Sequence, residues 1–336
     1  MRWWRMRMFG GFIWGSGLVC KQGWALPKKD GVARASGLWR LSARKCAPFA
    51  RGVQGRALAL LFLTFVLSGP ANAENTMQRL MVEAGEVRIE TVVQGAGPAI
   101  VMLPSLGRDG FEDFDDVAQR LAAAGFLVLR PQPRGIGHSA GPMEGVSLHH
   151  LAGDVAAVIA RLGNGRAVII GHAFGHFVAR MTAVDHPELV RGVVLAAAAA
   201  AQYAPEIAAA PRIIGDPSQP EAERLRNLKL AFFAPGHDPV HWLTGWYPAT
   251  LRMQADSREK QGIQQSDWWS AGNAAMLELI PAEDPFKPRE KWGELRGQFG
   301  ARVSTAVIPD ASHALFPEAP GAVAEAVIGW VRTLPP

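Results

Sequence analysis

The chain has 336 residues, and 49% of them are hydrophobic, so it is long enough to bury a sizeable core and too apolar to be a disordered protein. Its formal net charge is +5, but twelve of its 35 Lys and Arg residues and only one of its 30 Asp and Glu residues lie within 1–73. The other 263 residues hold 23 basic and 29 acidic side chains, a net charge of about −6. A nucleic-acid-binding function inferred from the basic overall charge is therefore excluded.

Residues 51–73 have the order of parts found in a secretory signal peptide. Two arginines precede a mainly apolar run at 57–67, and a Ser-Gly-Pro break then leads to small residues that predict cleavage after Ala73. The run is shorter than the roughly 20 residues that span a bilayer. We therefore expect an exported, periplasmic or secreted protein with no stable membrane span after cleavage, or a membrane-tethered one if the leader is retained. Both cysteines, Cys20 and Cys46, lie in the leader, which fits an exported chain without disulfides.

The next part of the chain alternates two kinds of pattern. Short apolar runs bounded by turns predict strands, and amphipathic segments between them predict helices, as in a mainly parallel sheet with helices on both faces. The predicted strands are 87–93, 99–104, 126–131, 167–171 and 190–197, and the predicted helices are 111–124, 148–162 and 174–185.

The alternation stops at 203–270, a stretch of helical, proline-punctuated sequence that holds four of the six tryptophans beyond the leader. It then resumes with predicted strands at 275–281 and 302–309 and predicted helices at 290–299 and 319–334. We therefore predict an α/β core formed by 74–202 and 271–336, with 203–270 inserted as a helical cap. Rings in the cap line a pocket, with Trp242, Trp246 and Trp268 as the candidates, or pack the cap's own core, or do both.

The stretch "AVIIGHAFGHFVA" (167–179) reads as a buried strand, a turn flanked by glycines and the start of a helix. Such a strand–turn–helix commonly carries a nucleophile in the pattern G-x-S-x-G. Here the middle position is Ala173, within Gly171-His172-Ala173-Phe174-Gly175.

Four further segments follow in a recognisable order. They are "LPSLG" (103–107), "PQPRGIGHS" (131–139), "IPAEDP" (280–285) and "IPDASHALFPE" (308–318). Together with the turn at 171–175, this layout resembles the α/β-hydrolase superfamily over essentially all of 85–334. The resemblance implies an eight-stranded-type, mainly parallel sheet and the chain order nucleophile turn, acid, histidine.

The resemblance also implies roles for individual residues. His313 would be the general base, and Asp284, with Glu283 as the fallback, would orient its ring and stabilise the imidazolium. Backbone N–H groups of Phe174 and of Ser105 or Leu106 would form an oxyanion hole.

Ala173 departs from the family pattern. A methyl group cannot attack a carbonyl, and loss of the serine from a working triad lowers the rate by about 10⁶. A conventional serine esterase is therefore not expected. The halide- and epoxide-cleaving branches of the superfamily need an aspartate at this position, so they are not expected either.

Four explanations remain open. The first is an engineered Ser→Ala replacement, which the retained leader argues against. The second is chemistry that needs only the His–Asp pair and the oxyanion hole, either hydrolysis by water attack or proton abstraction. The third is a substitute nucleophile, and the fourth is a non-catalytic protein that binds a ligand. The substitute nucleophiles considered are Ser105, Ser139, Ser312, His172 and His176; the last two are also predicted to line the pocket.

No cofactor or metal is expected. The histidine pairs His149-His150 and His237/His241 are the only clusters, and Pro239 breaks the helical spacing of the second pair. The glycines of 131–139 lack the acidic ribose-binding residue of a dinucleotide site. The expected partner is a small, largely apolar molecule with a carbonyl or an acidic hydroxyl group.

Overall fold

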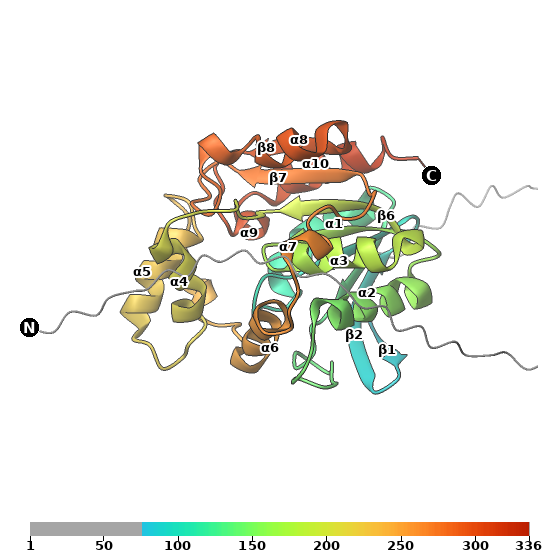
Figure 1. Cartoon of the computed structure of the whole chain (residues 1–336), viewed down its shortest axis with the longest axis horizontal. Coiled ribbons are helices and arrows are strands. Elements are labelled where there is room, and N and C mark those ends of the chain that lie inside the picture. Colours follow the sequence, from blue (N-terminus) through green and yellow to red (C-terminus); the bar gives the residue numbers. More distant parts are fainter. Residues whose placement is uncertain (1–75, 336) are drawn as a thin grey trace, which may run out of the picture. The chain divides into compact units, whose positions relative to one another are not determined.

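The computed structural model describes residues 76–335, and the predicted leader with its 57–67 segment and its cleavage site lies outside them. Within these residues the strands form one eight-stranded sheet in the order β1-β2-β4-β3-β5-β6-β7-β8 (Figure 1). β1 pairs antiparallel with β2, and β2 pairs antiparallel with β4, whereas every other pairing is parallel. The strands are β1 (Gln78–Ala84), β2 (Val87–Gly95), β3 (Ala99–Leu103), β4 (Leu127–Pro131), β5 (Ala167–His172), β6 (Val190–Ala196), β7 (Met276–Pro281) and β8 (Val303–Ile308).

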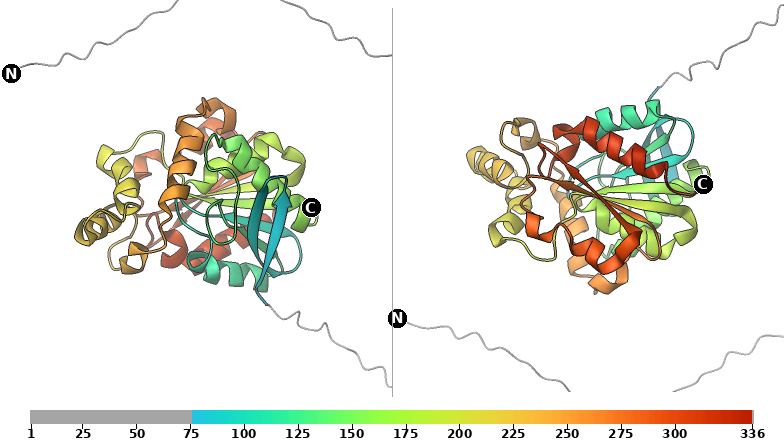
Figure 2. Two further views of the ribbon diagram at one scale, coloured as in Figure 1. Left: turned by 90° about the horizontal axis from the view of Figure 1, so that it is seen from below. Right: turned by 90° about the horizontal axis from the view of Figure 1, so that it is seen from above.

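Helices cover both faces of this sheet. Every residue of β3, β4, β5 and β7 is buried, which explains why these strands are apolar without alternation. One core cluster joins the sheet to α2, α3 and α8, and a second joins it to α1, α9 and α10 on the opposite face (Figure 2). These helices are α1 (Asp115–Ala123), α2 (Leu148–Leu162), α3 (Gly175–Asp185), α8 (Glu294–Phe299), α9 (Leu315–Glu318) and α10 (Pro320–Val331).

The predicted eight-stranded, mainly parallel sheet is confirmed, but sequence reasoning missed β1. Five of its seven residues are exposed, so this edge strand lacks the apolar signature that revealed the others. Gly85, at φ 63°, makes the tight connection between β1 and β2. A glycine at a turn between two short runs is the sequence signal that could have revealed β1.

The inserted segment is helical, with α4 (Pro205–Ile214), α5 (Glu221–Ala231), α6 (Pro248–Glu259) and α7 (Gln265–Trp268). Its apolar cluster, which includes Leu228, Phe232 and Trp242, also takes in Phe286 and Ala314 from the loops that follow β7 and β8. The cap therefore packs directly on the loops at the carboxyl ends of the strands. No helix within 76–335 is both long enough and apolar enough to cross a membrane.

Candidate active site

The turn between β5 and α3 is tightly constrained. A Cβ on Gly171 would lie 2.5 Å from the backbone of Gly175, and a Cβ on Gly175 would lie 2.6 Å from the carbonyl oxygen of Leu103, so both positions require glycine. Between them Ala173 has φ 45°, a left-handed conformation that costs an L-residue about 1–2 kcal/mol. The Ala173 N–H is held by the carbonyl of Ala196 at 2.9 Å. The chain thus presents residue 173 on a strained turn, with only a methyl group as its side chain.

His313 and Asp284 form a buried hydrogen-bonded pair. Nδ1 of His313 lies 3.0 and 3.2 Å from the two carboxyl oxygens of Asp284, and both residues are at most 5% exposed. Because a carboxylate only accepts, Nδ1 is the protonated nitrogen and Nε2 is left as an acceptor. The backbone N–H of Phe286 also donates to Asp284 at 2.9 Å, which fixes the carboxyl group. The imidazole is further held by the rings of Phe286, at 4.2 Å between centroids, and Phe232.

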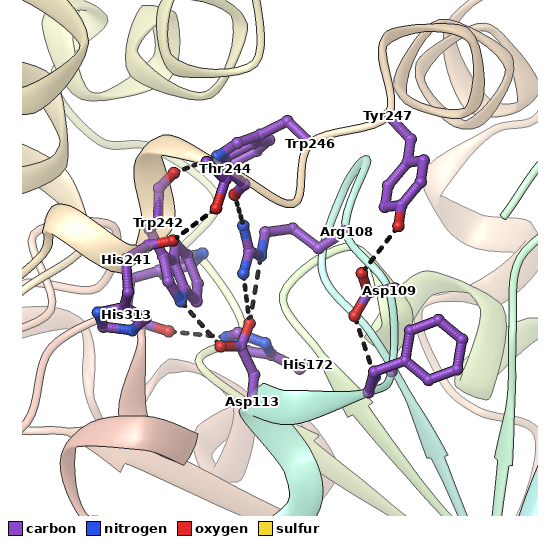
Figure 3. A network of polar contacts seen from close by, with 12 residues as sticks. Arg108, Asp109, Asp113, His172, His241, Trp242, Thr244, Trp246, Tyr247 and His313 are labelled. Atoms are coloured by element: carbon purple, nitrogen blue, oxygen red, sulfur yellow. Dashed lines mark hydrogen bonds and ion pairs between the residues drawn. The ribbon is translucent and has the colours of Figure 1, made fainter. Parts of the chain in front are cut away.

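His172 lies beneath this pair and does not face a cavity, which corrects the expectation that it borders the pocket. Its Nε2 donates to the backbone carbonyl of His313 at 2.7 Å, so it anchors the loop that carries the base (Figure 3). Complete burial, together with the nearby His313, lowers the pKa of His172 to about 3. His172 is therefore a neutral hydrogen-bond donor that holds the loop, and it is not available as a nucleophile.

A cavity of about 150 Å³, here called the His313 cavity, opens above the turn. Its core-side wall includes His313, Ala173, Phe174, Ser105 and Leu106. The backbone N–H groups of Phe174, Ser105 and Leu106 donate to no acceptor among the described residues, and neither does the buried Ser105 hydroxyl. The structure therefore gathers the predicted base, the bare turn and the predicted oxyanion donors on one wall.

The three candidate tryptophans lie in three different places. Trp246 lines the His313 cavity, but Trp268 lines a neighbouring one of about 310 Å³, here called the Trp268 cavity. Trp242 lines neither: it is fully buried in the cap core, where Nε1 donates to Asp113 at 3.0 Å (Figure 3). The helical spacing of these rings could not show which face of the cap each one occupies.

The cap holds the loop that follows β3. The carbonyl of Gly107 accepts from the backbone N–H of Tyr247 at 2.9 Å, and the N–H of Gly107 donates to Oε1 of Gln254 at 2.7 Å. Arg108 donates to Asp113 and to the carbonyl of Thr244, and its guanidinium stacks 4.2 Å from the centre of the Trp242 ring (Figure 3). The position of the Ser105 and Leu106 N–H groups therefore depends on the cap.

Other candidate residues are engaged elsewhere. The hydroxyl of Ser139 donates to the carbonyl of Gln132, and that of Ser312 donates to the carbonyl of Glu283. The Glu283 side chain is exposed, so Asp284 is the acid that meets the histidine. Of the substitute nucleophiles, only Ser105 and His176 line the His313 cavity.

The two histidine pairs have separate partners. His149 contacts Asp185, and His150 accepts from the backbone N–H of Ser147 at the start of α2. His237 and His241 bond to backbone carbonyls. Across residues 76–335 no group of three or more His, Cys, Asp or Glu side chains could hold a metal ion.

Two cavity residues stand out electrostatically. His176 is buried, its Nδ1 has no hydrogen-bond partner among the described residues, and burial followed by the charges of Arg180 and Arg258 lowers its pKa well below 6.5. Arg258 of α6, which sequence reasoning missed, lines both cavities. An arginine in a helix of a polar, aromatic cap carries no motif, so only its position in the fold reveals it.

Comparison with known proteins agrees with the observed fold. Residues 98–320 match the family model described as the alpha/beta hydrolase fold, which covers well over half of the chain. The chain belongs to the α/β-hydrolase fold family. An esterase from Exiguobacterium antarcticum superposes with a TM-score of 0.64 at 19% identity, over 76% of this chain and 100% of the esterase. At that identity the likeness shows the shared fold alone.

Three relatives with similar sequences are named as hydrolases. The bifunctional epoxide hydrolase 2 of Sus scrofa is 35% identical over 109 residues, which are 32% of this chain and 20% of that protein. The 2-(acetamidomethylene)succinate hydrolase of Mesorhizobium japonicum is 28% identical over 113 residues, 34% of this chain and 40% of that protein. Epoxide hydrolase A of Mycobacterium tuberculosis is 29% identical over 221 residues, 62% of this chain and 61% of that protein. Each match thus covers less than two thirds of the relative's length.

Proposed function

We propose that this α/β-hydrolase-family protein hydrolyses a small carbonyl compound, such as an ester or lactone, by direct attack of water that His313 activates. The observation that carries the proposal is the His313–Asp284 hydrogen bond beside a cavity whose floor is the Ala173 methyl group. A nucleophilic side chain at 173 would occupy the space above the turn. With alanine there, that space is free for a water molecule.

The proposed reaction uses one proton transfer in each direction. Nε2 of His313 takes a proton from water as the water oxygen bonds to the carbonyl carbon, and Asp284 stabilises the imidazolium that forms. The negative charge on the former carbonyl oxygen is received by the N–H groups of Phe174 and of Ser105 or Leu106, which lie at the start of α3 and after β3. The imidazolium then returns the proton to the leaving oxygen, which gives an acid and an alcohol.

The relatives support hydrolysis over proton abstraction from a substrate hydroxyl, which the same base could perform, because the named relatives are hydrolases. The epoxide hydrolases among them make epoxides a second substrate class to test. In this chain an epoxide would also have to be opened by water, since Ala173 cannot form a covalent intermediate.

The test is a substrate panel of short esters, lactones and styrene oxide with the wild-type protein, Ala173→Ser and His313→Ala. We expect slow but measurable wild-type turnover that His313→Ala removes, and no burst of covalent intermediate in the wild type. Turnover of esters by Ala173→Ser together with none by the wild type would overturn the proposal. The protein would then be a ligand-binding member of the family that has lost its reaction.

A further inference from the structure

The His313 cavity and the Trp268 cavity adjoin each other, and the two together are here called the recess. They share five lining residues: His176, Phe177, Ala199, Tyr203 and Arg258. The region around His313 is mostly apolar, with Phe232 and Phe286 beside the base. A substrate that reached from His313 toward Trp268 would pass Arg258, which lines both cavities.

Arg258 stacks on an aromatic ring and makes no hydrogen bond to another described residue. Its guanidinium carbon lies 4.6 Å from the centre of the Phe177 ring, which orients the planar group. It forms an ion pair with Glu259 at 3.6 Å, which is longer than a hydrogen bond, and its side chain is 40% exposed. It donates no hydrogen bond to any residue within 76–335. Arg212 donates to both carboxyl oxygens of Glu259, at 3.0 and 3.1 Å.

The charges around this recess are not balanced. Arg212 and Arg258 face a single carboxylate, Glu259, among the residues that line the His313 cavity, and Arg258 is the one residue with a permanent charge among those that line the Trp268 cavity. His176 adds no charge, because burial lowers its pKa well below 6.5 and keeps the ring neutral. The junction of the two cavities is therefore positive, and its guanidinium group, that of Arg258, makes no hydrogen bond to another described residue.

We propose that Arg258 binds a carboxylate of the substrate, so that the substrate is a small carbonyl compound with a separate anionic group. A guanidinium that is fixed on an aromatic ring matches the two oxygens of a carboxylate with two parallel hydrogen bonds. The earlier expectation was a largely apolar ligand. This inference replaces it with a ligand whose reacting end is apolar and whose far end is anionic. It rests on the proposed function only in taking this recess as the substrate site.

A binding experiment tests the inference without any turnover. Calorimetry would compare N-butylsuccinamate, which carries a carboxylate, with the neutral N-butylsuccinamide. We expect the wild type to bind the acid about 10- to 100-fold more tightly, the range for charge-assisted hydrogen bonds, and Arg258→Gln to lose that preference. Arg252→Gln is the matched control, because it removes the same charge from an exposed position of α6 and should keep the preference.

Equal binding of the two compounds by the wild type, or an unchanged preference in Arg258→Gln, overturns the inference. Arg258→Lys keeps the charge without the planar fork and should bind the acid with intermediate affinity. If the wild type hydrolyses 4-nitrophenyl hydrogen succinate, Arg258→Gln should raise KM for this ester and leave KM for neutral 4-nitrophenyl butyrate unchanged. Binding without hydrolysis would overturn the proposed function and leave the carboxylate site standing.

Discussion

The two walls of the His313 cavity are built in different ways. On the core wall, Ala173, Phe174 and Ser105 lie in the turns that begin where β5 and β3 end, and His313 lies in the loop after β8. Backbone hydrogen bonds and close glycine contacts fix these positions. On the cap wall, the lining consists of side chains such as those of Trp246 and Arg258, whose positions depend on how each cap segment is rotated. The core wall therefore suits chemistry that needs exact placement, and the cap wall suits selection of the substrate.

The largest expected effect is on the core wall. Asp284→Asn keeps the size of the side chain but can present its amide to Nδ1 of His313, which would favour the wrong tautomer of the base. In an enzyme that works as proposed, kcat should fall by about 10⁴. Steady-state kinetics on the best substrate of the panel, with circular dichroism to confirm folding, would measure it. A loss of less than tenfold would argue that His313 does not act as a base.

The largest expected effect on stability is in the cap. Trp242 is fully buried, packs with Phe232 and donates a hydrogen bond to Asp113. Trp242→Ala should therefore lower the free energy of unfolding by about 3–5 kcal/mol. Trp242→Phe, which keeps a ring and loses the hydrogen bond, should cost less. Urea unfolding would give both values. If the two variants are equally stable, Trp242 does not organise the cap as its burial indicates.

His172 makes the stability of the core wall depend on pH. Its pKa is about 3 in the folded protein, against an ordinary value of 6.5, so between these pH values the unfolded chain binds a proton that the folded chain does not. The free energy of unfolding should fall as the pH drops through this window, by up to about 1.4 kcal/mol per pH unit from this residue. His172→Gln keeps an N–H donor and should show a shallower decline between pH 6.5 and pH 5. Equal slopes in the two proteins would contradict a neutral, buried His172.

The contact between the two walls is tested at Gln254. Gln254→Leu leaves the N–H of Gly107 without its acceptor, which should cost about 1–3 kcal/mol and disturb the loop that carries Ser105 and Leu106. We expect kcat to fall, and Gln254→Glu, which retains an acceptor, to recover most of it. A variant that loses stability but keeps its full kcat would show that the cap does not position the oxyanion donors.

The smallest effect is expected at Ala173 itself. Ala173→Gly relieves the left-handed strain at φ 45° and adds conformational freedom to the unfolded chain, so the net gain should be at most about 1 kcal/mol. Differential scanning calorimetry would measure it against wild type. A clear loss of stability would mean that packing of the methyl group outweighs the strain.

Much of the core wall could be predicted from the sequence. The turn at 171–175, Asp284 and His313 each follow a strand that the sequence predicts, and residues that follow parallel strands meet at one edge of the sheet. The cap wall was predicted less well. The sequence left open whether Trp242 and Trp268 line the pocket with Trp246 or pack the cap's core, and helix rotation and loop packing placed them in the cap core and in the neighbouring cavity.

The sequence by itself determined the fold family and the absence of a side-chain nucleophile at residue 173, because both depend on local patterns of apolar runs, glycines and one small residue. Tertiary structure separates Asp284, the acid predicted from the sequence, from its neighbour Glu283, because Asp284 meets His313 whereas the Glu283 side chain is exposed. It also decided that Arg258, which is far from the turn at 171–175 in sequence, lines the same cavity as Ala173. Such placements depend on the packing of the cap against the sheet, which no local pattern encodes.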